Sequence, residues 1–258
     1  MRGQSPHNLD GRRRKTTPQG EVGAGRVALL IRSRGNEKLK LVRKLHDRRW
    51  RDKLGLFVAE GEDLVDAARN AGWEVVELLV AGENVEPALL AEVSSLGHPP
   101  RIIGIFRRRE AAPAADVSLA LWHVSDPGNV GTLIRSADAF GAGVMLSDGC
   151  ADPFGPKALR AAMGSTFRVP LTGVELRNAV ALVADGGEEF ESLELERYAT
   201  FVLGAEREGL PEDLLAQCEA RATIPVRNVE SLNVAMAGTI ALYERARRAT
   251  QTVSSRPS

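Results

Sequence analysis

Residues 224–244 read IPVRNVESLNVAMAGTIALYE and combine a short apolar strand, a polar turn and a helix rich in small residues. α/β proteins build ligand sites at such turns, because the first backbone N–H groups of a helix have no partner inside it and point into the adjoining crevice. Ser231 and Asn233 stand where this helix is expected to begin. Both residue types are also favoured N-caps, so the segment alone fits a plain helix cap equally well.

The second half of the chain alternates between predicted strands and helices. Apolar runs predict strands at 119–124, 143–146, 167–171, 180–184, 200–203 and 222–226, and helical spacing predicts helices that end near 140 and cover 157–163, 211–217 and 232–248. This alternation is typical of a parallel sheet with helices on both faces, and it defines the fold class as α/β. Carboxyl ends of parallel strands share one edge, where ligands bind.

A smaller α/β unit precedes this one. Strands are predicted at 56–59, 75–80 and 102–106, and helices at 36–51, 63–70 and 87–96. A stretch of charged and then small residues with one proline separates the two units. The predicted division is a disordered basic tail at 1–26, the smaller α/β domain at 27–108, a linker at 109–117, the larger domain at 118–250 and a disordered tail at 251–258.

Charge is unevenly distributed along the 258 residues, although lysine plus arginine equals aspartate plus glutamate at 34 each. The first third is basic, which favours a polyanion-binding front end over a merely solvated helix face. Trp50 lies among these cations; a core position is the favoured interpretation, and stacking on a nucleobase is the alternative.

Several classes of protein are disfavoured by composition. The two cysteines, Cys150 and Cys218, form no metal-binding pattern, which argues against a disulfide framework and a structural zinc site, so no metal is expected. No apolar run approaches the ~18 residues of a membrane span, and the N-terminus lacks the apolar core of a secretory signal. A cytoplasmic protein without a membrane partner is therefore expected.

Three glycine-containing loops follow predicted strands. The first, DPGNVGTLIRSADAFGA at 126–142, carries Asn129 and Arg135, and an arginine one turn into a helix suits a phosphate or a developing oxyanion. The second, FVLGAEREGL at 201–210, places Glu206 between two glycines, and the third is the segment at 224–244. The first loop has G-x-x-G rather than G-x-G-x-x-G, which disfavours a dinucleotide-binding oxidoreductase.

Together these loops resemble the three signature motifs of the SpoU/TrmH family of RNA 2'-O-ribose methyltransferases, within the SPOUT class. The first domain is similar to the substrate-binding domain of many members, through Ser33, Asn36, the basic helix and the segment LFVAEG at 56–61. The resemblance covers residues 31–248. It implies a SPOUT domain with a deep trefoil knot, S-adenosylmethionine as cofactor, an RNA substrate and a homodimer with the active site near the subunit interface.

The resemblance also assigns residues to roles. Arg135 and Asn129 match the catalytic arginine and asparagine of the family. Cofactor contacts are expected from Leu203, Gly204, Glu206, Gly209, Ile224, Pro225, Ser231, Leu232 and Asn233. The positive charge of the predicted first helix, rather than the resemblance, predicts RNA contacts from Lys40, Arg43, Lys44, Arg48, Arg49 and Arg51, and Arg160 is a further candidate for which ordinary surface chemistry is the alternative. Ribosomal RNA of the 23S type is the first choice of substrate and transfer RNA the alternative; an RNA-binding or ribosome-assembly factor that has lost catalysis is the alternative of another class.

This chain departs from the family pattern at three places. Ala205 stands where an asparagine is frequent, and Arg227 and Asn228 occupy a stretch where a glycine is common. The segment 172–180 is short for the helix that family members have there. These differences bear on how the cofactor is held more than on the class of activity.

Overall fold

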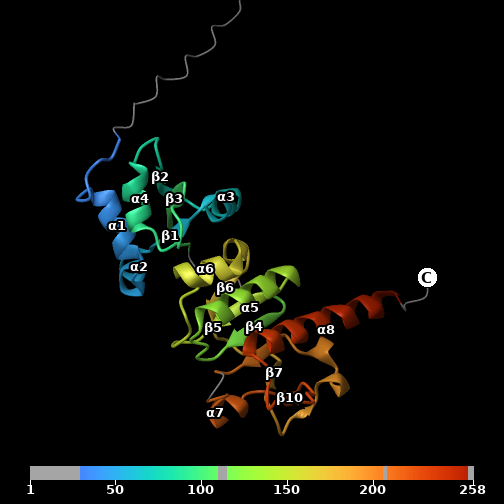
Figure 1. Cartoon of the computed structure of the whole chain (residues 1–258). Helices are drawn as coiled ribbons and strands as arrows, with labels where there is room; N and C mark the ends of the chain where they lie inside the picture. The colour runs from blue at the N-terminus through green and yellow to red at the C-terminus, as the bar shows by residue number, and fades with distance from the viewer. Residues whose placement is uncertain (1–29, 110–114, 206–207, 255–258) are drawn as a thin grey trace, which may run out of the picture.

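A computed structural model describes residues 30–109, 115–205 and 208–254 (Figure 1). The predicted tail at 1–26, residues 110–114 of the predicted linker, and Glu206 lie outside the described residues. Residues 251–254, expected in a disordered tail, instead form the last turn of a helix. No helix within the described ranges is both long and apolar enough to cross a membrane.

The smaller unit is a three-stranded antiparallel sheet in the order β1-β3-β2, formed by Leu56–Glu60, Ile102–Arg107 and Val75–Val80. Its helices are α1 (Glu37–Leu45), α2 (Arg48–Leu54), α3 (Glu62–Asn70) and α4 (Pro87–Val93). The single basic helix expected at 36–51 is therefore two helices. The first ends at Leu45 with His46 as its C-cap, and Asp47 caps the second, because its side chain accepts a hydrogen bond from the backbone N–H of Arg49 at 2.8 Å.

The larger unit is a seven-stranded, fully parallel sheet in the order β6-β5-β4-β9-β7-β10-β8. Its strands are β4 (Ser118–Leu121), β5 (Gly143–Leu146), β6 (Leu171–Gly173), β7 (Ala179–Leu182), β8 (Glu188–Glu189), β9 (Thr200–Leu203) and β10 (Ala220–Thr223). Its helices are α5 (Pro127–Ala139), α6 (Pro156–Ala162), α7 (Glu212–Leu215) and α8 (Val234–Ser254), with short 3-10 turns at Ser165–Phe167, Phe190–Ser192 and Leu195–Arg197. The α/β class with a parallel sheet is confirmed.

Two local predictions for this unit need comment. The strand expected at 167–171 is wrong: Ser165–Phe167 form a 3-10 turn, and β6 begins only at Leu171. No helix separates β6 from β7, which agrees with the short segment noted at 172–180. The trefoil knot that the resemblance implies stays a prediction.

Two glycines let α5 pack closely against its neighbours. A Cβ added to Gly131 would lie 2.4 Å from the carbonyl oxygen of Ala158 on α6, and one added to Gly238 on α8 would lie 2.4 Å from a methyl of Leu133. Gly131 therefore serves helix packing inside α5 rather than the turn before it. A hydrogen bond between the hydroxyls of Ser136 and Thr239, 2.7 Å apart, also joins α5 to α8.

The two units meet through an aromatic cluster, at a contact where α6 faces β1 (Figure 1). Phe57 and Trp73 from the smaller unit pack against Phe154 and Phe167 from the larger one, with ring centroids 4.9 to 5.9 Å apart. The indole N–H of Trp73 donates to the carbonyl of Phe167 at 3.0 Å. Apolar burial of this kind holds the two sheets in one arrangement.

A buried carboxylate completes this contact. Asp152 accepts hydrogen bonds from Nε of Arg51 at 2.6 Å and from an amino group of Arg108 at 2.9 Å. The side chains of Asp152 and Arg51 are only 7% and 5% exposed. Arg51 also donates to the carbonyls of Leu45 and His46, so its guanidinium is hydrogen-bonded to groups inside the protein.

We expect Asp152→Asn to lower the free energy of unfolding by about 3–5 kcal/mol, because removing one partner leaves a buried guanidinium without its counter-charge. Equilibrium urea unfolding measures this loss. Glu62→Gln is the matched control, since Glu62 pairs with Arg101 at the exposed surface, where ion pairs contribute about 0–1 kcal/mol. A loss no larger than that of the control would contradict the structural role of Asp152.

Candidate active site

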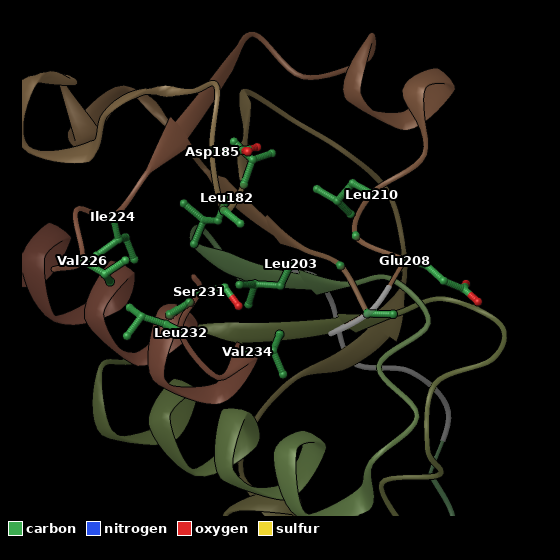
Figure 2. A pocket seen from close by; sticks show the side chains of 16 residues that line it. Leu182, Asp185, Leu203, Glu208, Leu210, Ile224, Val226, Ser231, Leu232 and Val234 are labelled. Atoms are coloured by element: carbon green, nitrogen blue, oxygen red, sulfur yellow. The ribbon is translucent and has the colours of Figure 1, made fainter. Parts of the chain in front are cut away.

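A cavity of about 360 Å³ opens at the carboxyl ends of β7, β9 and β10 (Figure 2). Pockets that hold cofactor-sized ligands have volumes of about 300–1,000 Å³. The three strands are neighbours in the parallel sheet, so the loops that follow them converge on one place. The walls consist of residues 182–185, 203–205, 208–210, 224, 226, 231, 232, 234 and 237.

The loop after β9 closes on itself through two glycines. The backbone N–H of Gly209 donates to the carbonyl of Ala205 at 3.0 Å, and Gly209 has a φ of +65°, which favours glycine. A Cβ on Gly204 would lie 2.4 Å from the carbonyl oxygen of Gly209, so only glycine fits there. Because Ala205 acts through its backbone, the departure from the family asparagine does not prevent the loop from closing.

Asn233, rather than Ser231, is the N-cap of α8. Its side-chain oxygen accepts hydrogen bonds from the backbone N–H groups of Ala235 at 2.9 Å and Met236 at 3.4 Å. Ser231 lies two residues earlier and lines the cavity (Figure 2). The capping role predicted for Ser231 is therefore wrong.

A side-chain hydrogen bond connects the first and third loops. The amide nitrogen of Asn233 donates to the side-chain oxygen of Asn129 at 3.1 Å, across 104 positions of sequence. Asn129 lies in the first turn of α5, which Asp126 caps by accepting from the Asn129 backbone N–H at 2.8 Å. This contact places the start of α5 directly beside the cavity wall that Ser231 and Leu232 form.

Arg135 lies on α5 and is exposed to solvent. Among the described residues, no hydrogen bond or ion pair engages its guanidinium. Asp138, the acidic residue three positions further along α5, pairs with Arg168, whose Nε lies 3.1 Å from a carboxylate oxygen. Arg135 does not line the cavity, so its side chain is available to a ligand approaching from outside.

The expected cofactor residues divide into three groups. Six line the cavity: Leu203, Gly204, Gly209, Ile224, Ser231 and Leu232. Pro225 and Asn233 adjoin it without lining it, and Glu206 lies outside the described residues. Sequence reasoning missed the wall at 182–185 that follows β7, including Asp185, and also Glu208 and Val226. The wall at 182–185 could have been predicted, because the sequence predicts a strand at 180–184 whose carboxyl end belongs to the same edge of the sheet.

The chemistry of the walls suits S-adenosylmethionine. Leucine, isoleucine and valine side chains can cover the flat adenine ring, and backbone groups of the glycine loop can hydrogen-bond to its edge. Asp185 and Glu208 are the acidic residues among those that line the cavity, although the Glu208 carboxylate points outward in Figure 2; a carboxylate near the cavity suits a ligand that carries a sulfonium and an ammonium group. The described residues contain no group of three His, Cys, Asp or Glu side chains that could hold a metal ion.

The cations predicted to contact RNA differ in their surroundings. Arg51 is buried against Asp152 and cannot reach a phosphate, so the prediction that Arg51 contacts RNA is wrong. Arg160 donates to the hydroxyl of Ser95 at 3.1 Å across the contact between the units. Lys40, Arg43, Arg48 and Arg49 pair with Glu37, Glu92, Asp52 and Asp47 respectively, whereas Lys44 is exposed and forms no ion pair with any described residue.

Ser95 belongs to a polar network around the buried Glu60. Glu60 accepts hydrogen bonds from the backbone N–H and hydroxyl of Ser95 and from the hydroxyl of Ser94, and His46 lies 3.2 Å away. Burial raises the pKa of Glu60, but hydrogen bonds from His46, Ser94 and Ser95 outweigh it and lower that pKa to about 2. Arg160 therefore donates to a serine that itself binds a buried carboxylate.

Comparison with known proteins identifies the class of this site. Residues 116–243 match the SpoU rRNA Methylase family, and residues 36–104 match the MRM3-like substrate binding domain. The 23S rRNA (guanosine(2553)-2'-O)-methyltransferase RlmP of Bacillus subtilis is 34% identical over 241 residues, covering 83% of this chain and 97% of that protein. The chain belongs to the SpoU rRNA methylase family.

Solved structures of this SpoU family agree in fold. An AdoMet-bound rRNA methyltransferase from Sinorhizobium meliloti is 30% identical, with a TM-score of 0.76 over 85% of this chain and 97% of that one. The SpoU methyltransferase AviRb from Streptomyces viridochromogenes, in complex with AdoMet, is 25% identical, with a TM-score of 0.76 over 86% and 100%. The SPOUT fold, the class of enzyme and the methyl-donor cofactor expected from the loops are thereby confirmed.

We expect Asn233→Ala to lower the free energy of unfolding by about 1 kcal/mol, because α8 loses its N-cap. Asn233→Asp keeps an oxygen that accepts from Ala235 and places a negative charge at a helix N-terminus, so it should retain the stability of the natural protein. The aspartate cannot donate to Asn129, and methyl transfer should therefore fall in both variants. Thermal unfolding and a methyl-transfer assay measure the two effects; equal destabilisation by both substitutions would contradict the cap.

Proposed function

We propose that this protein transfers a methyl group from S-adenosylmethionine to a ribose 2'-OH of large-subunit ribosomal RNA. The observation that carries the proposal is the hydrogen bond between Asn129 and Asn233, which joins the start of α5 to the wall of the cofactor-sized cavity. The names of RlmP and of a 23S rRNA (uridine(2479)-2'-O)-methyltransferase of Streptomyces viridochromogenes, 28% identical, support ribosomal RNA as the substrate. The smaller basic unit supports it as well.

S-adenosylmethionine supplies an electrophilic methyl group when bound, so the protein has to align the ribose hydroxyl and help it lose its proton. Asn129 is oriented by Asn233 and is proposed to position the ribose or Arg135. Arg135 is proposed to act on the hydroxyl. A free arginine keeps its proton up to pH ~12, so Arg135 either stabilises the forming alkoxide as a cation or acts as a base with help from a substrate phosphate.

The remaining site residues have proposed binding roles. The residues proposed to hold the cofactor are Leu203, Gly204, Gly209, Ile224, Ser231, Leu232 and Asp185. Pro225, Asn233 and Glu206 are proposed to support the loops around the cofactor. Transfer RNA stays the alternative substrate. A factor without catalysis is disfavoured, because Arg135, Asn129 and the Ser231–Asn233 triplet are all present.

A homodimer is proposed through the exposed face of α8. Met236, Ile240 and Tyr243 follow one another at helical spacing and are 60%, 37% and 54% exposed. Tyr243 also packs edge-on against Phe140 at the end of α5, with ring centroids 6.3 Å apart. Adjacent exposed apolar side chains of this kind favour a protein interface. A cytoplasmic location is part of the proposal and rests on the bacterial ribosomal RNA methyltransferases among the relatives.

We expect Arg135→Ala to reduce methyl transfer at least about 100-fold, as loss of one stabilising donor does in other enzymes, while S-adenosylmethionine affinity stays unchanged. Transfer of tritiated methyl to ribosomal RNA and calorimetry with the cofactor measure the two quantities. Arg177→Ala is the control, because Arg177 is exposed and pairs only locally with Glu175 at 2.8 Å. Full activity of the Arg135 variant would remove that residue from the mechanism.

We expect Ile240→Glu to convert a dimer to a monomer, because the interface would bury an unpaired carboxylate. Size-exclusion chromatography with light scattering measures the mass. Thr250→Glu introduces the same charge further along α8, at an exposed position, and should leave the dimer intact. A natural protein that is monomeric at micromolar concentration would overturn the proposal.

A further inference from the structure

Trp50 on α2 lies outside the hydrophobic core. It belongs to none of the four buried clusters of the described residues, and its side chain is partly exposed. The sequence favoured a core position for this residue, and that interpretation is wrong. An indole that does not pack internally presents a large aromatic face at the surface.

Three cations surround this indole. The amino nitrogens of Lys44 and Lys53 lie 5.0 and 5.1 Å from the ring centroid, and the guanidinium carbon of Arg49 lies 5.7 Å from it. All three side chains belong to exposed residues, and Leu54, one turn after Trp50, is 37% exposed. We call Lys44, Arg49, Trp50 and Lys53 the Trp50 corner.

The positive charge of the Trp50 corner is only partly neutralised by nearby carboxylates. Within the described part of the chain, neither Lys44 nor Lys53 forms an ion pair, and Arg49 has only a 3.5 Å contact with Asp47. Neighbouring cations are satisfied: Lys40 pairs with Glu37 at 2.7 Å, Arg43 pairs with Glu92 at 3.2 Å, and Arg51 is buried. Like charges held around one ring repel one another, so an anionic partner would stabilise them.

An RNA strand supplies both groups that this corner lacks. A nucleobase offers a flat face that stacks on an indole, and its flanking phosphates offer the negative charge. Lysine has a flexible four-carbon stem, so Lys44 and Lys53 can turn from the ring to a phosphate. An acidic protein surface would satisfy the lysines but would give the indole no stacking partner.

We propose that Trp50 is a base-stacking residue for the substrate RNA, with Lys44, Lys53 and Arg49 contacting the phosphates beside the stacked nucleotide. This inference rests on the proposed function and narrows its RNA-binding surface from a whole basic helix to one corner. The stacked base is unpaired, because bases inside a helix do not expose their faces.

The test compares Trp50→Leu with Trp50→Phe in binding to protein-free large-subunit ribosomal RNA from cells that lack the protein. Leucine preserves apolar contacts but cannot stack, and we expect it to weaken binding about tenfold, within the range measured for lost base–aromatic stacking. Phenylalanine should retain most of the affinity. The KM for RNA should rise in the leucine variant while kcat and the affinity for S-adenosylmethionine stay unchanged.

The salt dependence of RNA binding distinguishes the contribution of the indole ring from that of the cations. Lys44→Gln and Lys53→Gln should each reduce the slope of log affinity against log salt concentration by about 0.7–0.9, whereas Trp50→Leu should lower affinity without changing the slope. Arg101→Gln is the matched control, since Arg101 is an exposed cation of the same unit that pairs with Glu62 at 2.9 Å. Circular dichroism and thermal unfolding confirm that each variant is folded.

Stacking also has an optical signature. The chain has three tryptophans, so RNA should quench more fluorescence in the natural protein than in Trp50→Phe. Natural-level binding and quenching in the Trp50 variants, while the natural protein methylates this RNA, would overturn the stacking role and leave the proposed function standing. Absence of methyl transfer by the natural protein would instead count against the function. An effect of Trp50→Leu seen only on assembled subunits, and not on protein-free RNA, would assign the corner to a protein partner.

Discussion

The close packing of α5 between α6 and α8 is the constraint on which the site depends. Gly131 and Gly238 remove the side chains that would keep these helices apart, and the hydroxyls of Ser136 and Thr239 bond across one of the two contacts. Because α8 lies this close, Asn233 at its start reaches Asn129 at the start of α5. A larger side chain at either glycine would separate the two loops and open the site.

The sheet order explains why the other walls converge. β7 lies between β9 and β10 in the sheet although β9 and β10 both follow it in the chain, and each strand ends at the same edge. The loop after β9 folds back through Gly204 and Gly209, so its backbone rather than its side chains shapes the cavity. This accounts for the tolerance of an alanine at 205.

The sequence predicted the fold class, most strands and helices and the three loops, because hydrophobic periodicity and glycine placement are local signals. It did not predict the break at Asp47, since both helices share one apolar pattern and only the cap separates them. It missed Asp185, because that residue enters the site through the order of strands and not through a motif. The sequence also could not predict which cations form ion pairs. Arg51 and Lys44 are both basic residues of the same predicted helix, yet Arg51 is buried against Asp152 and Lys44 is exposed.

Helix α2 connects the Trp50 corner of the smaller unit to the larger unit, which carries Arg135 and the cavity. Arg51 faces inward and bonds to Asp152 in the larger unit, while the preceding residue, Trp50, faces outward among its cations. The aromatic cluster of Phe57, Trp73 and Phe154 fixes the same contact from the other side. The Trp50 corner is therefore held at a constant position relative to the cavity. A nucleotide stacked there and a ribose at Arg135 must then be separated by a fixed span, so the shape of the RNA, as well as its bases, would decide which 2'-OH reaches the methyl donor.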